Sequence, residues 1–340
     1  MAITIGLTYD LRIHYLNQGY SLEQTAEFDR ESTIDFLEEA LFSLGHSVKR
    51  IGNIEELVRK LSDGERWDLV FNIAEGLSGL GREAQIPALL DAYSIPYTFS
   101  DPLRLSVCLH KGYAKRIFRD FGIPTTDFRI INNISDIRTI PFDFPIFLKP
   151  VAEGTSKGVD QDSKALDEYQ LEKKCRQLLT SFNQPVLAEP FLPGREFTVG
   201  IIGTGEKASA LGTLEIILLE NAETEAYSYF NKENCELLVN YQLAEDSTAK
   251  EAEYIALDAW KKLGLRDAGR VDLRCGKDGT LYIIEINPLS GLHPEHSDLP
   301  ILAARKGVSY LSLIKMIMDS ALERTEQKLL HSGSSFFINS

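Results

Sequence analysis

Two acidic residues near the carboxyl end of the chain are spaced so that they should face each other. The segment GRVDLRCGKDGTLYIIEIN (269–287) contains two runs of alternating apolar and polar residues around a Lys-Asp-Gly turn signal. A two-residue loop at 278–279 would pair Asp272 with Glu285 on one face of the hairpin. Directly opposed carboxylates, with Cβ atoms roughly 4.5–5.5 Å apart, repel each other. The pair therefore needs a cation between its members, unless the hairpin simply projects into water.

A glycine-containing loop is suited to binding phosphate. In KPVAEGTSKGV (149–159), Lys149 stands at the expected end of a strand and the loop residues 153–156 follow it. Glycine lets main-chain N–H groups approach phosphate oxygens, while hydroxyl and ammonium groups add donors. The segment is not a Walker loop, which requires GxxxxGK followed by Ser or Thr. An ordinary hairpin turn is the alternative interpretation.

A further segment has the residues of an adenine slot. In VLAEPFLPGREFTVGIIG (186–203), an apolar strand with Glu189 leads through Phe191 and Leu192 to a Pro-Gly turn and then to Glu196. Main-chain groups of such a segment can line the adenine while Glu196 reaches the ribose. A plain hairpin with two surface acids is the alternative.

Composition excludes several classes of function. The chain has 340 residues and a net charge of −14, with 36 Lys and Arg against 50 Asp and Glu. Such an acidic surface repels phosphate backbones, so general nucleic-acid binding is not expected. No apolar run approaches the roughly 20 residues that span a bilayer, and the amino terminus lacks signal-peptide features, so no membrane association is expected. The four cysteines form no CxxC pair, which favours reduced thiols in a cytoplasmic enzyme over a zinc site.

The elements that would position these residues fall into successive parts. Residues 1–104 alternate strand and helix patterns and predict an α/β domain with a Rossmann-like parallel sheet, covered on both faces. Residues 105–188 predict a central lobe with two short strands around the phosphate loop, and residues 189–325 predict an α+β catalytic lobe. Residues 326–340 are expected to form a flexible tail. The stretch 7–31 is expected to contain a long loop after the first strand.

Five stretches, in order, resemble the ATP-grasp superfamily and, within it, the D-alanine–D-alanine ligases. They cover about residues 105–315 and read LHKGYAKRIFRDFGIP, PIFLKPVAEGTSKGV, VLAEPFLPGREFTVGIIG, AGRVDLRCGKDGTLYIIEINPLSGL and HSDLPILAARKGVSYLSLI. The amino-terminal third resembles the family's preceding α/β domain more loosely. The resemblance implies an ATP-grasp fold and an ADP-forming ligase that joins a carboxylate to an amine through an acyl phosphate.

The substrates implied by this resemblance are small amino acids, with D-alanine as the default for both sites. Ligation of other amino acids in specialised peptide synthesis is one alternative, and a non-catalytic nucleotide-binding protein is another. A dinucleotide-dependent oxidoreductase is not favoured, because no GxGxxG follows the first strand. Homodimers are usual in the family, so a homodimer is expected.

The resemblance also implies roles for individual residues. Two Mg²⁺ ions, which Mn²⁺ can replace, would lie between the ATP phosphates and the three oxygen ligands Asp272, Glu285 and Asn287. The residues that would bind ATP are Lys111, Lys149, Glu153, Gly154, Thr155, Ser156, Glu189, Phe191, Leu192 and Glu196.

The catalytic roles concern the two amino acids. Arg270 and the main-chain N–H of Gly291 would stabilise the acyl oxygen. Lys232 would reach the phosphate from a mobile loop, and Ser297 would receive the carboxylate of the second amino acid. Glu27 would hold the ammonium of the first amino acid, with an ordinary helix-start acid as the alternative.

Departures from the family pattern lie around the amino-acid pockets. The family's glycine-rich motif is absent after the first strand, so that Glu27 in TAEFDRE is only the best match. Glu233 stands where the ligases usually carry a tyrosine, and the segment 288–300 (PLSGLHPEHSDLP) is about one residue longer than usual. The reaction type is therefore better defined by the sequence than the substrates are.

Overall fold

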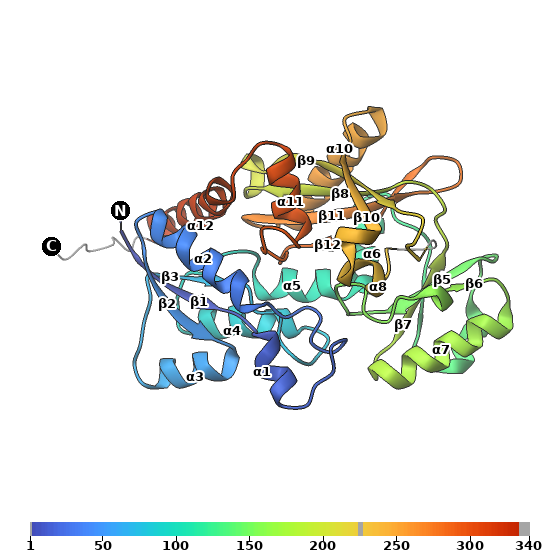
Figure 1. Ribbon diagram of the computed structural model, residues 1–340, viewed down its shortest axis with the longest axis horizontal. Helices are drawn as coiled ribbons and strands as arrows, with labels where there is room; N and C mark the ends of the chain where they lie inside the picture. Colours follow the sequence, from blue (N-terminus) through green and yellow to red (C-terminus); the bar gives the residue numbers. More distant parts are fainter. Residues whose placement is uncertain (1, 224–226, 333–340) are drawn as a thin grey trace.

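The computed structural model describes residues 2–223 and 227–332. Within these ranges the chain forms three β-sheets in separate parts of the molecule, with helices between and around them (Figure 1). One sheet belongs to the amino-terminal third, one to the middle of the chain and the largest to the carboxyl-terminal part. No described helix is long and apolar enough to cross a membrane.

The amino-terminal sheet is parallel, which confirms the prediction from its alternating pattern. Its strands β1 (Thr4–Thr8), β2 (Ser47–Gly52) and β3 (Leu69–Asn72) lie in the order β2-β1-β3. The apolar spacing of α2 buries Ile34, Leu37 and Leu41 completely. The helices of this part are α1 (Arg12–Asn17), α2 (Glu31–Ser43), α3 (Ile54–Ser62), a 3₁₀ turn (Arg82–Ala84) and α4 (Gln85–Ala92).

The segment between β1 and α2 is not a simple loop, so the expectation for residues 7–31 is wrong where α1 forms. This short helix is stabilised by tertiary contacts. The ring of Tyr15 packs 4.5 Å from that of Phe28, and the Tyr15 hydroxyl donates to the buried Asp10 carboxylate. Such contacts outweigh a local sequence that has little helical periodicity.

The middle sheet is antiparallel and has the order β4-β7-β5-β6. The expected second strand directly after the phosphate loop is absent, because the chain turns at Gly158, whose φ angle is 76°, and continues into the 3₁₀ turn Gln161–Ser163. The partner of β5 begins instead at Lys164. The elements are β4 (Arg129–Ile131), β5 (Ile146–Pro150), β6 (Lys164–Ala165), β7 (Val186–Pro190), α7 (Glu168–Phe182) and two 3₁₀ turns (Ile134–Thr139 and Gln161–Ser163).

The largest sheet is antiparallel and has the order β10-β9-β8-β11-β12. Helix α10 packs against it through Trp260, which is fully buried. The elements of this part are β8 (Glu196–Ile202), a 3₁₀ turn (Gly205–Lys207), β9 (Ser209–Leu218), α8 (Tyr229–Glu233), α9 (Cys235–Leu238), β10 (Val239–Leu243), α10 (Ser247–Leu263), β11 (Ala268–Cys275) and β12 (Leu281–Asn287).

The β11–β12 hairpin has the predicted register at its functional end, although the predicted turn is wrong. Asp272 pairs with Glu285 and Arg270 pairs with Asn287. Near the turn Cys275 pairs with Leu281, which makes the connection longer than two residues. The register shifts by one residue between Asp272 and Leu273, at a β-bulge on the opposite strand that restores the pairing of the acids.

Two packing features cut across the predicted domain limits, which remain a prediction. Helix α6 (Lys111–Asp120), which follows α5 (Pro102–Leu109), contributes Phe118 to the core of the largest sheet. Helices α11 (Asp298–Arg305) and α12 (Tyr310–Ser332) return to the amino-terminal sheet and share its core (Figure 1). Because α12 continues to Ser332, a tail beginning at 326 is wrong for residues 326–332. Residues 333–340 of that tail lie outside the described residues.

Candidate active site

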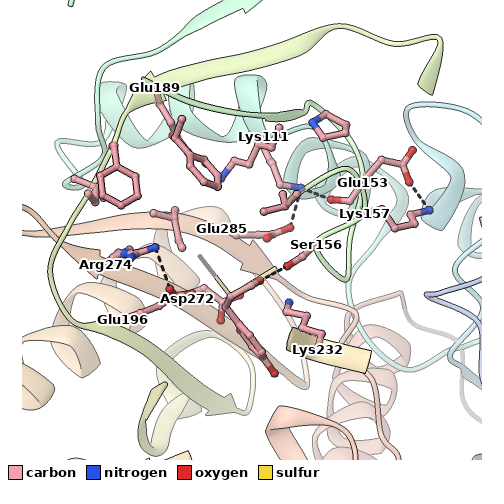
Figure 2. A pocket seen from close by; sticks show the side chains of 18 of the residues that line it. Lys111, Glu153, Ser156, Lys157, Glu189, Glu196, Lys232, Asp272, Arg274 and Glu285 are labelled. Atoms are coloured by element: carbon pink, nitrogen blue, oxygen red, sulfur yellow. Dashed lines mark hydrogen bonds and ion pairs between the residues drawn. The ribbon is translucent and has the colours of Figure 1, made fainter. Parts of the chain in front are cut away.

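Two adjoining cavities contain most of the predicted site residues. The first, which we call the lysine cleft, has a volume of about 800 Å³ and lies between the middle and largest sheets (Figure 2). The second, which we call the acidic cavity, has a volume of about 1410 Å³ and adjoins the amino-terminal part. The two cavities meet at Tyr227, Lys232 and Arg270, which line both. Other residues define the lysine cleft (Lys111, Lys149, Phe191 and Glu285) and the acidic cavity (Glu27, Asp29, Glu75, Ser297 and Asp298).

Acidic side chains hold the lysines of the lysine cleft. At the start of α6, Lys111 reaches across to Glu285 with an Nζ–Oε1 distance of 2.9 Å (Figure 2). At the end of β5, Lys149 lies 2.9 Å from Glu189, which also binds Lys115 at 2.8 Å. Burial alone would raise the pKa of Glu189, but these two lysines lower it to about 2. Glu189 therefore positions Lys149 at the cleft.

Arg270 links the two cavities through a pair of acids. Its Nη1 lies 3.0 Å from Asp272 on the cleft side and 2.7 Å from Asp298 on the cavity side. The amide of Asn287 donates to Asp272 over 3.2 Å. Burial raises the pKa of Asp272 to about 6, although Arg270 and Lys232 oppose the shift. An additional positive charge beside Asp272 would therefore be favourable.

Lys232 has no ion-pair partner among the described residues. Its Nζ lies 4.8 Å from the centre of the Tyr227 ring. Burial and the neighbouring charge of Arg270 lower the pKa of Lys232. This ammonium group lies where the two cavities meet and is free to bind an anionic ligand.

Glu27 lies beside the phosphate loop, and cations already compensate its charge. Both of its oxygens accept from Arg82 at 2.8 Å, and Lys157 lies 2.6 Å away. The N–H of Gly154 also donates to Glu27 over 2.7 Å, and a Cβ added at Gly154 would meet that carboxylate at 2.3 Å. Burial alone would raise the pKa of Glu27, but Arg82 and Lys157 lower it to about 2. The predicted ammonium-binding role does not fit an acid whose partners are already present.

The phosphate loop and the 227–233 segment contact each other and are both held by the amino-terminal part. Ser156 Oγ donates to the carbonyl of Tyr227 over 2.7 Å, and the N–H of Tyr229 donates to the carbonyl of Val159. Glu233 forms an ion pair with Arg12 of α1 at 3.2 Å. The residue that departs from the family pattern thus joins α8 to α1.

Two acids of the acidic cavity, Asp29 and Glu75, have no cationic partner among the described residues. Burial raises the pKa of Asp29 to about 7, although a hydrogen bond from Thr33 opposes the shift. Burial, together with the charges of Glu83 and Glu27, raises the pKa of Glu75 well above its ordinary value. Both carboxyl groups line the cavity. They are the groups that a cationic ligand would stabilise.

Ser297 also lines the acidic cavity and directly precedes α11. The N–H of His293 donates to Ser297 Oγ over 3.0 Å, so the hydroxyl proton is free for another acceptor. A Cβ added at Gly291 would lie only 2.7 Å from Ser297 Oγ. Glycine at this position therefore lets the main chain approach the Ser297 hydroxyl closely. Helix α11 begins at Asp298, and the main-chain N–H groups of Asp298 and Leu299 in its first turn have no partner within the helix.

The adenine-slot residues surround one end of the lysine cleft. Glu196 pairs with Arg274 at 3.3 Å (Figure 2). Two cations lie near the ring of Phe191, with Lys164 Nζ 4.4 Å and Arg274 Cζ 5.3 Å from its centre. This arrangement gives the cleft an aromatic wall with a charged rim.

The structure brings the predicted residues together in two groups. The lysine cleft is lined by Lys111, Lys149, Glu153, Ser156, Glu189, Phe191, Leu192, Glu196, Asp272 and Glu285, the acidic cavity by Glu27, Thr155, Gly291 and Ser297, and both by Lys232 and Arg270. Gly154 and Asn287 stand behind these walls and contact Glu27 and Asp272. The sequence reasoning missed Asp298, Arg82, Lys115 and Asp29, whereas Lys157 was among the predicted donors of the phosphate loop. The adjacency of Asp298 to Ser297 was an available signal, whereas no local pattern marks Arg82 as the partner of Glu27.

Comparison with known proteins agrees with this architecture. A D-alanine–D-alanine ligase from Aquifex aeolicus is 32% identical over 282 residues, which are 82% of this chain and 91% of that protein. A D-alanine–D-alanine ligase from Bordetella petrii is 29% identical over 285 residues, covering 83% and 84% of the two chains. The crystal structure of the D-alanine–D-alanine ligase from Bacillus anthracis complexed with ATP matches with a TM-score of 0.72 at 21% identity, covering 96% of this chain and 100% of that one.

The three sheets and the cleft between two of them are those of an ATP-grasp protein, as the sequence predicted. The family model described as "D-ala D-ala ligase C-terminus" matches residues 117–319. The chain therefore belongs to the D-alanine–D-alanine ligase family.

Proposed function

We propose that the protein is an ATP-dependent ligase that joins two amino acids, with D-alanine as the default for both. One observation carries this proposal. A cleft lined by several lysines meets a second cavity rich in acids, and Arg270 and Lys232 line both. An anionic group transferred from a nucleotide in the cleft to a carboxylate in the cavity would pass directly between these two cations.

In the first step, an oxygen of the first amino acid's carboxylate attacks the γ-phosphorus of ATP. The new O–P bond forms as the bond to the β-phosphate oxygen breaks, and ADP is the leaving group. Phosphoryl transfer depends mainly on positioning and charge neutralisation. Lys149 and Lys111 hold phosphate oxygens in the cleft, and Lys232 neutralises the transferred group. Ser156 and Thr155 close the loop over it.

In the second step, the amine of the second amino acid attacks the acyl phosphate carbon. The C–N bond forms as the bond between the acyl carbon and the phosphate oxygen breaks, inorganic phosphate leaves, and the proton lost by the amine passes to water. Arg270 and the N–H of Gly291 stabilise the negative charge that develops on the acyl oxygen. Ser297 and the first N–H groups of α11 hold the second carboxylate, which directs the amine toward the acyl carbon.

We assign the ammonium of the first amino acid to Asp29 rather than to Glu27. Asp29 lines the acidic cavity and has no cationic partner among the described residues, whereas Glu27 already binds Arg82 and Lys157. An α-ammonium group would neutralise the buried carboxylate of Asp29. Glu27 then acts as a positioning residue for the phosphate loop.

The donor set of the β11–β12 hairpin fits Mg²⁺. Asp272 and Glu285 are opposed in register. Burial raises the pKa of Asp272, so a further positive charge beside it would stabilise its ionised form. No group of three His, Cys, Asp or Glu side chains within the described ranges is arranged to hold a metal. Asp272, Glu285 and the Asn287 amide would therefore share the ion with phosphate oxygens, as Mg²⁺ commonly requires. When bound, Mg²⁺ supplies charge neutralisation for the phosphates.

A homodimer and a cytoplasmic location belong to the same proposal, since both are expected from the family and the composition. Size-exclusion chromatography with light scattering measures the first directly. The ligase activity is tested by phosphate release from ATP with pairs of D- and L-amino acids, followed by mass spectrometry of the products. Phosphate release that requires an amino acid, with an amide product, supports the proposal. ATP binding without such release would identify a non-catalytic nucleotide-binding protein.

A further inference from the structure

A third cavity, which we call the arginine pocket, has a volume of about 970 Å³. It is lined by the start of α6, by β4 with residues on either side of it, and by Pro185, which directly precedes β7. None of its described lining residues belongs to the lysine cleft or to the acidic cavity. Ile130 in its wall packs against Val151 and Ala152, which lead into the phosphate loop. The arginine pocket is therefore a separate place where a ligand can bind.

Two segments of the chain meet at this pocket. A Cβ added at Gly112 would lie 2.5 Å from Cδ1 of Ile130, so glycine lets the first turn of α6 approach β4 closely. This approach places His110 and Arg116 from the α6 segment at the same cavity as Arg129 from β4.

The arginine pocket is basic, although the chain has a net charge of −14. No acid of the described chain lines it. The lining contains three arginines, Arg116, Arg119 and Arg129. Arg119 is paired with Asp127 at 2.7 Å, whereas Arg116 and Arg129 form no ion pair with any described residue. The other acids nearest to them in sequence, Asp120 and Asp136, are not lining residues. Two guanidinium groups are therefore available to an anion.

These two arginines have donors left over. Arg129 donates from Nε to the carbonyl of Thr139 over 3.2 Å and from Nη1 to the carbonyl of Phe128 over 3.0 Å. Its Nη2 has no partner in the described part of the chain. Arg116 forms no hydrogen bond there, and its Cζ lies 5.3 Å from the centre of the Tyr113 ring. A guanidinium group has five N–H donors in a planar fork that matches the oxygens of a phosphate group.

The imidazole of His110 supplies a third donor. His110 is only 8% exposed, and its Nδ1 accepts from the N–H of Tyr113 over 3.2 Å at the start of α6. A ring nitrogen that accepts carries no proton, so the proton of this imidazole is on Nε2. This Nε2–H has no acceptor among the described residues, and the ring packs 4.3 Å from that of Tyr113 in the pocket wall. Since a largely buried donor without an acceptor is costly, an acceptor in the pocket would be favourable.

We propose that the arginine pocket binds a phosphate group, with His110, Arg116 and Arg129 as its donors. A phosphate group has three or more acceptor oxygens and can meet donors from three side chains at once, whereas a carboxylate has only two oxygens. The phosphate group belongs to a small phosphorylated metabolite or is free inorganic phosphate. This site goes beyond the proposed ligase function, because none of the three donors is assigned to ATP or to an amino acid.

Equilibrium binding to the full chain tests this site. Isothermal titration calorimetry is run at about 150 mM NaCl, which screens general electrostatic attraction. A saturating non-hydrolysable ATP analogue with Mg²⁺ occupies the lysine cleft, whose lysines would also attract phosphate. The probes are ribose 5-phosphate, inorganic phosphate and, as the neutral control, ribose. We expect a dissociation constant below about 1 mM for ribose 5-phosphate and no binding of ribose.

The two phosphate probes distinguish the sources of the group. Weaker binding of inorganic phosphate than of ribose 5-phosphate supports a phosphorylated metabolite as the ligand. Equal binding of the two supports a site for the free ion.

Variants locate the binding in the arginine pocket. Arg116→Gln and Arg129→Gln should each raise the dissociation constant at least tenfold, because each removes a charge-assisted hydrogen bond. His110→Asn keeps a side-chain oxygen that can cap α6 but removes the Nε2–H, so it should weaken binding at least threefold. Arg138→Gln is the matched control, since Arg138 is exposed in the neighbouring 3₁₀ turn and does not line the pocket.

Three results would overturn the proposal. They are no binding of either phosphate probe, binding that persists in both Arg116→Gln and Arg129→Gln and so reflects an adventitious ion only, and equal weakening in Arg138→Gln. If Arg129→Gln does not fold, Arg116→Gln decides, because this exposed side chain makes no hydrogen bond within the described chain. The ligase is tested separately by phosphate release from ATP, so failure of one proposal leaves the other standing.

Discussion

Replacing Glu27 by Gln tests whether this residue positions the phosphate loop or binds the first amino acid. The substitution removes the charge that holds Arg82, Lys157 and the N–H of Gly154. The carboxyl group has a folded-state pKa of about 2 against an ordinary 4.5, and its side chain is 5% exposed. This difference corresponds to about 3 kcal/mol of stabilisation at pH 7.

The expected loss is local to the phosphate loop. An opening free energy lower by about 3 kcal/mol makes amide hydrogen exchange roughly 100-fold faster. Hydrogen-exchange mass spectrometry of peptides that contain 153–158 measures this directly at pH 7. In steady-state assays the KM for ATP should rise more than the KM for either amino acid. The matched control is Glu23→Gln, since Glu23 is exposed and accepts one bond from the N–H of Gly158 over 3.3 Å.

The pH dependence provides a second check. Because the folded-state pKa of Glu27 is lowered, its contribution is complete above about pH 4.5 and is lost as the pH falls toward 2. The difference in loop-opening free energy between wild type and Glu27→Gln should therefore shrink to less than half at pH 3. Unchanged exchange in the loop at pH 7 would refute the positioning role. A rise confined to the KM of the first amino acid would instead support the ammonium-binding role predicted from the sequence.

The other predictions concern the assigned ligands. Asp29→Asn should raise the KM for the first amino acid more than tenfold with little change for ATP. Since Asp29 must be ionised to bind an ammonium group and its pKa is raised to about 7, wild-type kcat/KM for that substrate should fall below pH 7, and a flat profile would contradict this. Ser297→Ala should act on the KM of the second amino acid alone. Asp272→Asn should reduce turnover below about 1% with unchanged circular dichroism, and near wild-type turnover at saturating Mg²⁺ would remove it from the ligand set. Lys149→Ala should raise the KM for ATP at least tenfold, and unchanged ATP kinetics would exclude it from the cleft.

The sequence predicted best what local pattern determines. Strand alternation identified the opposed acids Asp272 and Glu285, and the prediction held although the turn was wrong, because the bulge near Leu273 compensates for the longer connection. Apolar periodicity likewise predicted the parallel amino-terminal sheet. In both cases the signal lies within a few residues along the chain.

What the sequence could not predict depends on contacts between distant segments. Arg82 and Glu27 are brought together only by the fold, so the charge on Glu27 looked available from the sequence. Motif matching could not distinguish Glu27 from Asp29, two residues further on, because burial and partners decide which acid is free. The residue pattern after the phosphate loop likewise did not show that the chain passes through a 3₁₀ turn (Gln161–Ser163) before the partner strand of β5 begins at Lys164.

Helix α12 determines when, during synthesis, the protein can complete its first core. Leu313, Ile314 and Ile317 of this helix are fully buried in the same cluster as Ile5 and Leu37. A ribosome adds roughly 5–20 residues per second, so the amino-terminal sheet waits roughly 12–50 s for these side chains after its own strands have been made. During that interval its uncovered apolar face is open to chaperones and to aggregation. A prematurely terminated chain that lacks α12 therefore cannot complete the core of its amino-terminal sheet.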